Sequence, residues 1–383
     1  MLTRRERILR TMKGEPVDRL AVSPRFWKFC MAYYGAATLE NMLRSADEFE
    51  WDMLFYPPAG VRNYFGASIP SPETLPEAVT CTGTLVEDDD VRVVHREFTT
   101  PAGRLTDTWY DPKPGRGYGI SPTANPKETL LKCPGDLEAL RYLRGQVMPE
   151  VIQEFMSSDR QIGDNGFLIP YVRSPFDGLS YVYPAADCMM LPYDDPQFLR
   201  DLLAFLQEMC LDDIRAHLQA GAASIYLSGF HVSLSVGWSP QVFREFFLPL
   251  IKEQVDLTHN GGALAHYYDD GKCMALLPML LEVGVDVFET CTPWPAGDFE
   301  PRAAKALVGD RLTLMGYVDI ETVLHRGTPE LVEQTVREAV EILGCDGRYV
   351  IGTSDGILAQ TPLENVCAFF AAGRKYGALV LTR

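Results

Sequence analysis

The chain has 383 residues, 46% of them hydrophobic, which is enough to bury a large core. Its formal net charge is −17 and it has no block of basic residues, so we expect no nucleic-acid partner. No apolar run of about 18 residues occurs, and because no apolar stretch follows the first residues we expect no secretory leader. The nine cysteines are scattered without a CxxC pair. We therefore expect a cytoplasmic protein with reduced thiols and no membrane partner.

Amphipathic periodicity predicts a first helix over residues 3–13, ended by Gly14. From about residue 20 the chain repeats one pattern of an apolar strand, a polar or glycine-containing turn and a periodic helix. Between the strands, helices are clearest over 196–219 and over 240–258, where Ser239 precedes a proline suited to the first turn. The candidate strands are 19–26, 51–56, 167–172, 223–228, 263–268, 285–289, 312–316 and 348–352.

The order of these elements predicts an α/β fold in a single domain over residues 1–383. Apolar strands that alternate with helices are typical of a parallel sheet, and eight such units favour a closed (β/α)8 TIM barrel over an open sheet. Residues 78–112 break this order with segments of period two, which predict antiparallel β-hairpins inserted after the second strand. Residues 112–126 contain several Pro and Gly and are expected to form a loop over the barrel mouth.

Polar residues that directly follow the strands are the site candidates, because barrel enzymes build their sites at the carboxyl ends of the strands. The fifth strand ends in a cluster that includes His266, Tyr268 and Asp270, which is costly to bury unless its members are paired or liganded. A solvated turn in which Asp270 caps the next helix is the structural alternative. His231 follows the neighbouring fourth strand, so the two histidines favour a functional pair, although each could be a satisfied structural residue.

The sixth strand ends in Glu289, for which an ion pair with Arg25 or Arg173 is the structural interpretation. The two arginines can equally bind a substrate carboxylate through two parallel hydrogen bonds. Aromatic residues near the first two strand ends, Trp27 and Tyr56 among them, are candidates for an aromatic-substrate pocket. They can also be core residues or contacts of a homodimer.

Five segments resemble the uroporphyrinogen decarboxylase-like superfamily, in the order in which that family has them. They are RERILRTMKGEPVDRLAV, CMMLPYDDPQFLRDLLAFL, SPQVFREFFLPLIKEQVDL, LLEVGVDVFET and GTSDGILAQTPLENVCAFF. The resemblance covers nearly the whole chain and implies the barrel fold. It leaves the type of reaction open, because one fold supports many activities.

Departures from the decarboxylase pattern disfavour decarboxylation of uroporphyrinogen. The decarboxylase has an arginine-rich segment after strand one, where this chain has PRFWKFCMAYYG with Arg25 alone. It also has an aspartate after strand two, where this chain has Pro57, Pro58 and Ala59. A Gly-His-Gly type motif after its last strand is replaced here by SDGI, which contains Asp355.

The resemblance therefore favours the branch of corrinoid-dependent methyltransferases. In its zinc-binding members, a His-x-Cys at strand five and a Cys at strand eight bind the metal. Aligned on Gly271, these positions hold Tyr268, Asp270 and Asp355, so the thiolate ligands are missing. Such an oxygen-rich site suits an oxygen leaving group better than thiol activation. No DxHxxG corrinoid-binding motif occurs, so cobalamin is expected on a separate corrinoid-binding protein.

We therefore expect demethylation of a small-molecule methyl donor, a methoxylated and most simply aromatic compound, by methyl transfer to the cobalt of the partner corrinoid protein. A cofactor-free decarboxylase of a small or tetrapyrrole acid and a non-catalytic binding barrel are the alternatives. Acid assistance to the leaving oxygen is worth about 10²–10⁴-fold. The expected proton donors are Tyr268, Asp270 and Asp355, and the expected substrate-binding residues are Arg25, Trp27, Tyr56 and Arg173. If zinc is present, His231, His266 and Glu289 are the expected ligands, and the metal would act as a Lewis acid on the ether oxygen.

Overall fold

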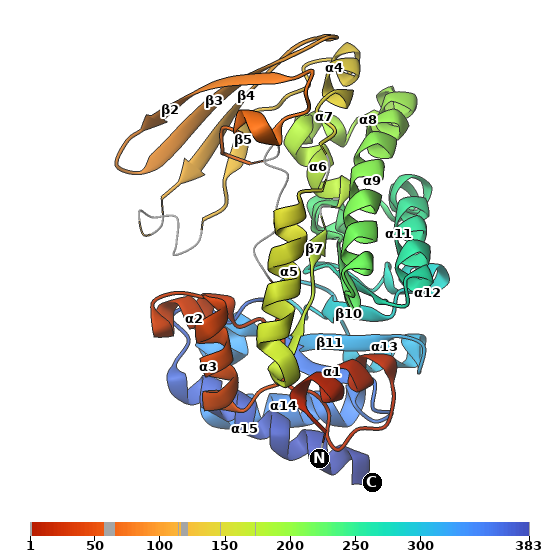
Figure 1. The fold of residues 1–383 in the computed structure, drawn as a ribbon. Helices are drawn as coiled ribbons and strands as arrows, with labels where there is room; N and C mark the ends of the chain where they lie inside the picture. Colours follow the sequence, from red (N-terminus) through yellow and green to blue (C-terminus); the bar gives the residue numbers. More distant parts are fainter. Residues whose placement is uncertain are drawn as a thin grey trace. The chain divides into compact units, whose positions relative to one another are not determined.

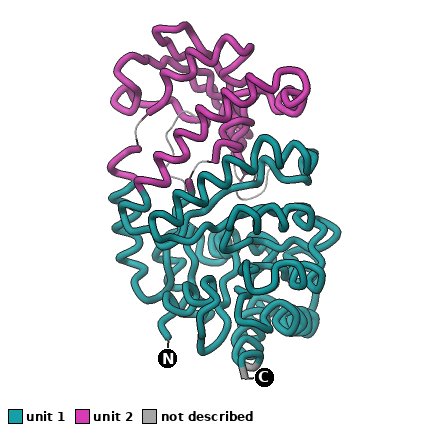
Figure 2. The backbone as a smooth tube through the Cα atoms, turned by 90° about the vertical axis from the view of Figure 1, so that its right-hand side faces the viewer, with its two compact units in different colours: residues 1–58, 152–171, 217–383 teal, residues 59–151, 172–216 magenta. Residues whose placement is uncertain are grey.

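The computed structural model describes residues 2–56, 66–113, 115, 122–145, 147–172 and 174–382 (Figure 1). The chain divides into two compact units, coloured separately in Figure 2. Unit 1 comprises residues 1–58, 152–171 and 217–383, and unit 2 comprises residues 59–151 and 172–216. The parallel strands lie in unit 1, apart from Val172 at the end of its strand, and the antiparallel sheet lies in unit 2. The single domain over residues 1–383 stays a prediction.

The parallel strands of unit 1 follow one another around a barrel in chain order. A two-stranded sheet joins β1 (Met53–Phe55) to β6 (Gly166–Leu168), and a six-stranded sheet has the order β12, β11, β10, β9, β8, β7. The strands of the larger sheet are β7 (Tyr171–Val172), β8 (Ser224–Ser228), β9 (Leu264–Tyr268), β10 (Val287–Thr290), β11 (Thr313–Val318) and β12 (Tyr349–Thr353). Among the described residues, the paired strands of these two sheets run parallel, as the sequence predicted.

The first predicted strand, over residues 19–26, is reduced to a single bridge. Val22 forms a parallel bridge with Ile351 of β12, and on its other side its carbonyl oxygen accepts a hydrogen bond of 2.9 Å from the backbone N–H of Asp52. This segment therefore occupies a full strand position between β12 and β1, although it is too short to be a strand.

Two further backbone hydrogen bonds continue the pairing through residues 169–170, which link β6 to β7; the first extends the pairing with β1, and the second joins β8 of the larger sheet. The N–H of Ile169 donates to the carbonyl of Phe55 at 3.0 Å, and the N–H of Tyr226 donates to the carbonyl of Pro170 at 3.3 Å. The ring of eight parallel strand positions is closed, and the predicted (β/α)8 barrel is confirmed.

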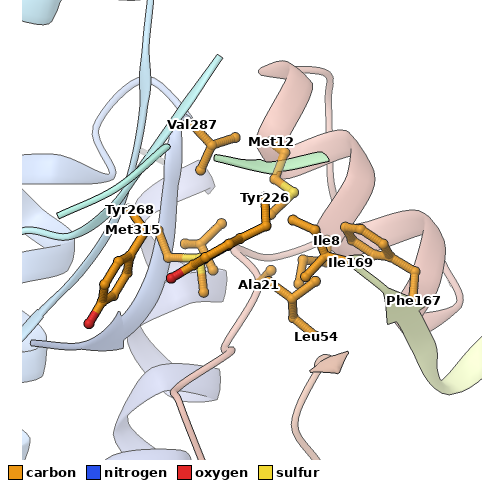
Figure 3. Close-up of a cluster of buried hydrophobic side chains, with 11 residues drawn as sticks. Ile8, Met12, Ala21, Leu54, Phe167, Ile169, Tyr226, Tyr268, Val287 and Met315 are labelled. Carbon is orange, nitrogen blue, oxygen red and sulfur yellow. The ribbon is translucent and has the colours of Figure 1, made fainter. Parts of the chain in front are cut away.

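Helix α1 (Arg4–Lys13) matches the prediction for residues 3–13. Thr3 accepts a hydrogen bond from the backbone of Glu6, and the Glu6 side chain accepts one from Thr3 in return, which is a capping box. Gly14 ends the helix with φ 68°, a left-handed conformation that glycine adopts without strain. Ile8 and Met12 of this helix join the buried cluster of Figure 3, which also contains Tyr226 and Tyr268 from the barrel strands.

The helix predicted over residues 240–258 forms with an irregular turn inside it. It begins as α10 (Pro240–Val242) behind its cap Ser239, continues as the π-helix η6 (Phe243–Phe247) and ends as α11 (Leu248–Asn260). Pro249 in the first turn of α11 has no backbone N–H to donate, and the π turn stands at the break in the hydrogen-bond ladder that this causes.

The other helices complete the chain. They are α2 (Trp27–Tyr34), α3 (Leu39–Phe49), α4 (Leu137–Arg141), α5 (Pro149–Ile162), α6 (Pro175–Val182), α7 (Ala185–Cys188), α8 (Leu191–Asp194), α9 (Pro196–Gln219), α12 (Leu277–Val283), α13 (Pro301–Val308), α14 (Pro329–Leu343), α15 (Leu363–Leu379), the π-helix η7 (Ile320–His325) and the 3-10 helices η1 (Pro72–Thr74), η2 (Pro134–Asp136), η3 (Gly163–Asn165), η4 (Phe230–Val232), η5 (Leu234–Val236) and η8 (Val380–Thr382). None of the helices in the described part of the chain has both the length and the apolar character that crossing a membrane requires.

Unit 2 contains the predicted insertion as a four-stranded antiparallel sheet of order β2, β3, β4, β5. Its strands are β2 (Thr80–Glu87), β3 (Val91–Thr100), β4 (Gly103–Pro112) and β5 (Asn125–Glu128). The hairpins predicted over 78–112 are confirmed, whereas β5 lies partly inside residues 112–126, which were predicted to be a loop. Arg96 and Asp107 form a buried ion pair between β3 and β4, and Trp109 donates to the same carboxylate at 2.8 Å.

Candidate active site

Arg25 lies at the centre of a polar network at the carboxyl ends of the barrel strands. Its Nε donates to Oε1 of Glu289 at 2.9 Å, and its Nη2 donates to the hydroxyl of Tyr226, also at 2.9 Å. Its backbone is held by the end of β12 and the segment after it, because its N–H donates to Thr353 Oγ1 and its carbonyl accepts from the N–H of Ile357. The side chain is 14% exposed and is fixed from both ends.

Three tyrosine rings surround the guanidinium group of Arg25. Its central carbon lies 4.1 Å from the ring centroid of Tyr268, 4.8 Å from that of Tyr56 and 5.6 Å from that of Tyr226. Aromatic faces attract a cation, and more strongly when water is excluded. Burial opposes the charge, but Glu289 and the three phenols outweigh it and raise the pKa of Arg25 well above its ordinary value.

Glu289 on β10 is 1% exposed and contacts three partners. Its Oε1 accepts from Arg25 and from the hydroxyl of Tyr56 at 2.9 Å, and its Oε2 lies 3.0 Å from Nε2 of His266. Burial alone would raise its pKa, but Arg25, His266 and Tyr56 lower it to about 2. These contacts hold Glu289 in its charged form, and the ion pair with Arg25 that was the structural interpretation is the arrangement that forms.

The residues present do not fit the expected zinc site. Both oxygens of Glu289 are engaged in hydrogen bonds: Arg25 and Tyr56 donate to Oε1, and Nε2 of His266 bonds to Oε2. His231 lies in η4, where its ring packs edge-on against Phe230 with centroids 4.9 Å apart. Within the described ranges, no group of three or more His, Cys, Asp or Glu side chains is arranged to hold a metal ion. This geometry gives no support to His231, His266 and Glu289 as ligands.

Polar residues at the ends of β9 and β12 lie close to Arg25 at the mouth of the barrel. The hydroxyl of Tyr268 donates to Oδ2 of Asp270 at 3.0 Å. Lys28 donates to Oδ2 of Asp355 at 3.2 Å, and Nη1 of Arg25 lies 3.9 Å from the other oxygen of Asp355. Burial and the charge of Asp355 raise the pKa of Asp270, while the hydrogen bond from Tyr268 opposes this. Asp270 thus keeps its proton to a higher pH than an ordinary aspartate does.

The predicted substrate-binding residues other than Arg25 differ in their place in the structure. Tyr56 contacts Glu289 and Arg25, as described. Trp27 is the first residue of α2, with the ammonium group of Lys28 lying 5.4 Å from its ring centroid. Arg173 lies outside the described residues, as do the positions 57–59 that follow strand two.

Sequence reasoning missed Tyr226, because it lies within β8 and not at a strand end. Lys28 and Asp269 lie in the segments that end the first and fifth predicted strands, but they were not selected as site residues. Asp269 is fully buried, whereas an Asp-Asp pair is also typical of a solvated turn.

Asp269 is a buried carboxyl beneath the loop after β9. Its Oδ1 accepts from the N–H of Gly271 at 3.1 Å, while its Oδ2 has no hydrogen-bond partner among the described residues. Burial, together with the charges of Asp270 and Asp298, raises its pKa to about 8, although Ser233 and Gly271 act in the opposite direction. Asp269 is therefore protonated near neutral pH and uncharged.

Two cysteines lie close to this region, and neither is a thiolate. Cys273 follows the β9 loop, Cys291 follows β10, and both are fully buried. Burial raises the pKa of Cys273 well above its ordinary value and raises that of Cys291 too. The site is thus rich in oxygen donors and lacks an ionised sulfur at these positions.

The chain is a closed (β/α)8 barrel with ionisable side chains gathered at the carboxyl ends of its strands, which is where enzymes of this fold have their active sites. The family model described as uroporphyrinogen decarboxylase (URO-D) matches residues 120–376, which is more than half of the chain. The chain therefore belongs to the URO-D family, as its sequence segments indicated.

Its relatives include both methyltransferases and decarboxylases. The chain is 24% identical over 207 residues to a methylated-thiol–coenzyme M methyltransferase of Methanosarcina mazei, covering 54% of this chain and 52% of that relative. It is 25% identical over 287 residues to a uroporphyrinogen decarboxylase of Synechococcus, covering 70% of this chain and 78% of that enzyme. The match thus spans about half the length of the methyltransferase relative.

A solved methyltransferase structure from Methanosarcina mazei has the same fold. Its TM-score is 0.67 at 19% sequence identity, and the match covers 98% of this chain and 99% of that one. At this identity the likeness establishes the barrel and does not establish the reaction.

Proposed function

We propose that this chain is a corrinoid-dependent methyltransferase that demethylates a methoxylated, aromatic substrate and works with a separate corrinoid-binding protein. The observation that carries the proposal is the hydrogen-bonded pair of Tyr268 and Asp270 beside Asp355, an acid group at the mouth of the barrel. The similarity to a methyltransferase supports the reaction class. The oxygen groups of Tyr268, Asp270 and Asp355, which stand at the positions of the metal ligands in the zinc-binding members, favour an oxygen leaving group over a sulfur one.

Loss of a methyl group from an aryl ether leaves the electron pair of the carbon–oxygen bond on the oxygen. A reduced corrinoid on the partner would supply the electron pair that accepts the methyl group. Asp270 would give its proton to the leaving oxygen, directly or through the hydroxyl of Tyr268, so that a neutral phenol departs. Asp270 is suited to this role because burial and Asp355 keep it protonated to a higher pH than usual.

Other residues of the site would bind and orient the substrate. Trp27 and Tyr56 offer aromatic faces, and the fixed charge of Arg25 lies 4.1 Å from the ring of Tyr268. A fixed cation near the leaving oxygen stabilises the negative charge that develops there without reorganising during the reaction. Lys28 and Asp355 are about 30% exposed at the rim, which leaves this edge open to a group carried by a partner.

The proposal is tested by adding a corrinoid protein and a reductant to the purified chain and offering methoxylated aromatic compounds, a methylated thiol and a carboxylic acid in parallel. Methyl transfer is followed by the absorbance of the corrinoid and by the phenol formed. Turnover of the methyl ether supports the proposal. Turnover of the thiol alone, release of CO₂ without corrinoid, or no turnover of any compound contradicts it.

Variants of the acid pair test its role. Tyr268→Phe and Asp270→Asn should each lower kcat by about 10–10²-fold with an unchanged denaturation midpoint. The wild-type rate should fall as pH rises through the raised pKa of Asp270, and Asp270→Asn should lose this dependence. Tyr376→Phe is a matched control, because Tyr376 donates its hydroxyl to Glu333 away from the strand ends. Unchanged kcat in both active-site variants would remove the acid pair from the mechanism.

A further inference from the structure

The charged side chains of the active site are paired with one another. Arg25 contacts Glu289 at 2.9 Å, and Lys28 contacts Asp355 at 3.2 Å. Each of these two cations therefore has its own carboxylate, and the described part of the site carries no surplus of positive charge.

The donors of Arg25 are also occupied or directed at an anion. Nε binds Glu289, Nη2 binds Tyr226, and Nη1 faces Asp355 at 3.9 Å. The faces of the group lie against tyrosine rings. An incoming carboxylate would have to displace Asp355 in order to reach Nη1.

A second carboxyl group stands beside this position. Asp270 is close enough to Asp355 for the two to interact electrostatically, and it is itself mostly buried. A substrate carboxylate at the mouth would therefore meet the charge of Asp355 and would place a further negative charge beside Asp270. Like charges placed together in an interface select strongly against the wrong partner.

We infer that the site takes an uncharged methoxyarene and discriminates against one that bears a carboxylate near Arg25 and Lys28. This inference rests on the proposed function and names the substrate class of the same site. It replaces the sequence-based expectation that Arg25 holds a substrate carboxylate.

The test compares 3-methoxybenzamide with 3-methoxybenzoate, which have the same shape and differ in charge. Binding to the complete chain is measured by calorimetry without corrinoid protein, and kcat/KM is measured with it. The neutral amide should bind at least about tenfold more tightly than the benzoate and show a kcat/KM higher by a similar factor.

Asp355→Asn supplies the second arm, because it releases Lys28 and Nη1 of Arg25 from their carboxylate. The benzoate should then bind about tenfold more tightly than it binds the wild type, while binding of the amide changes less than about threefold. Asp346→Asn is the matched control, since Asp346 also pairs with a lysine, Lys305 at 2.6 Å, away from the site. It should leave both affinities unchanged.

The outcomes separate the two proposals. If both compounds bind and the wild type prefers the benzoate, or Asp355→Asn does not favour the benzoate, this inference fails and the proposed function stands. If neither compound binds or is demethylated, and the only methyl ethers turned over carry a carboxylate or lack an aromatic ring, the substrate class inferred here is wrong. If no methyl ether is turned over, the proposed function fails and the inference fails with it.

Discussion

Replacing Glu289 with glutamine would remove the charge from a carboxylate that three side chains contact while keeping its shape. In the native protein both oxygens accept hydrogen bonds, from Arg25, Tyr56 and His266. A glutamine offers one oxygen and one NH₂ group, so a donor would face a donor at one of these contacts. Arg25 would also remain largely buried, 14% exposed, without its counterion.

Two routes give the same magnitude for the loss of folding free energy. Removing one member of a buried ion pair costs about 3–5 kcal/mol. The pKa of Glu289 falls from its ordinary 4.5 to about 2 on folding, which at ~1.4 kcal/mol per pKa unit corresponds to about 3 kcal/mol. Because the pKa is lowered, this contribution is present above pH 4.5 and is lost as the pH falls towards 2.

The assay is equilibrium unfolding in urea at pH 7, followed by tryptophan fluorescence and circular dichroism. Glu321→Gln is the matched control, because Glu321 is 41% exposed in its ion pair with Arg326 and should lose less than ~1 kcal/mol. If Glu289→Gln loses no more than this control, the network around Arg25 does not stabilise the fold and the reasoning is refuted.

Two other predictions concern backbone and burial. Asp269 has a pKa of about 8 in the folded chain against an ordinary 3.8, so between these values the unfolded state binds fewer protons and the stability of the wild type falls as pH rises. Asp269→Asn lacks this group, so its stability relative to the wild type should increase from about pH 5 to about pH 8 in unfolding titrations. A stability difference that stays constant over this pH range would contradict the prediction. Gly316→Ala should lose more than about 3 kcal/mol, because its φ is +117° and a Cβ would lie 2.3 Å from the carbonyl oxygen of Thr290. Gly347→Ala, at φ +82° with nothing within 4 Å, should lose only about 1–2 kcal/mol in the same measurement.

The barrel could be predicted because its signals are local. Apolar runs predicted the positions of β8, β9 and β10, and helical periodicity with Gly14 as the stop predicted α1. The segment 19–26 was harder, because Pro24 cannot donate to a ladder and α2 already begins at Trp27. β5 was missed because pairing with β4 is a contact between distant residues, which no short pattern reveals.

The residues that belong to the candidate site could be predicted more readily than the hydrogen bonds and ion pairs between them. The strand-end rule selected Arg25, Tyr268, Asp270, Glu289 and Asp355, and contacts in the structure join all of them. Which cation pairs with which carboxylate depends on side-chain directions across the barrel, and the sequence carries no signal for these.

The bridge between Val22 and Ile351 ties barrel closure to the order of protein synthesis. Residues at this seam are separated by 328 positions, as in the hydrogen bond from Arg25 to Thr353. At ~5–20 residues per second, a ribosome needs roughly 15–65 s to make the second side of the seam after the first. The edge of the first barrel segment that faces β12 must therefore stay unpaired through most of translation, although its other edge can bond to Asp52 early. The same wait applies to Arg25, whose backbone N–H bonds to the last residue of β12 and whose carbonyl bonds to Ile357 after that strand.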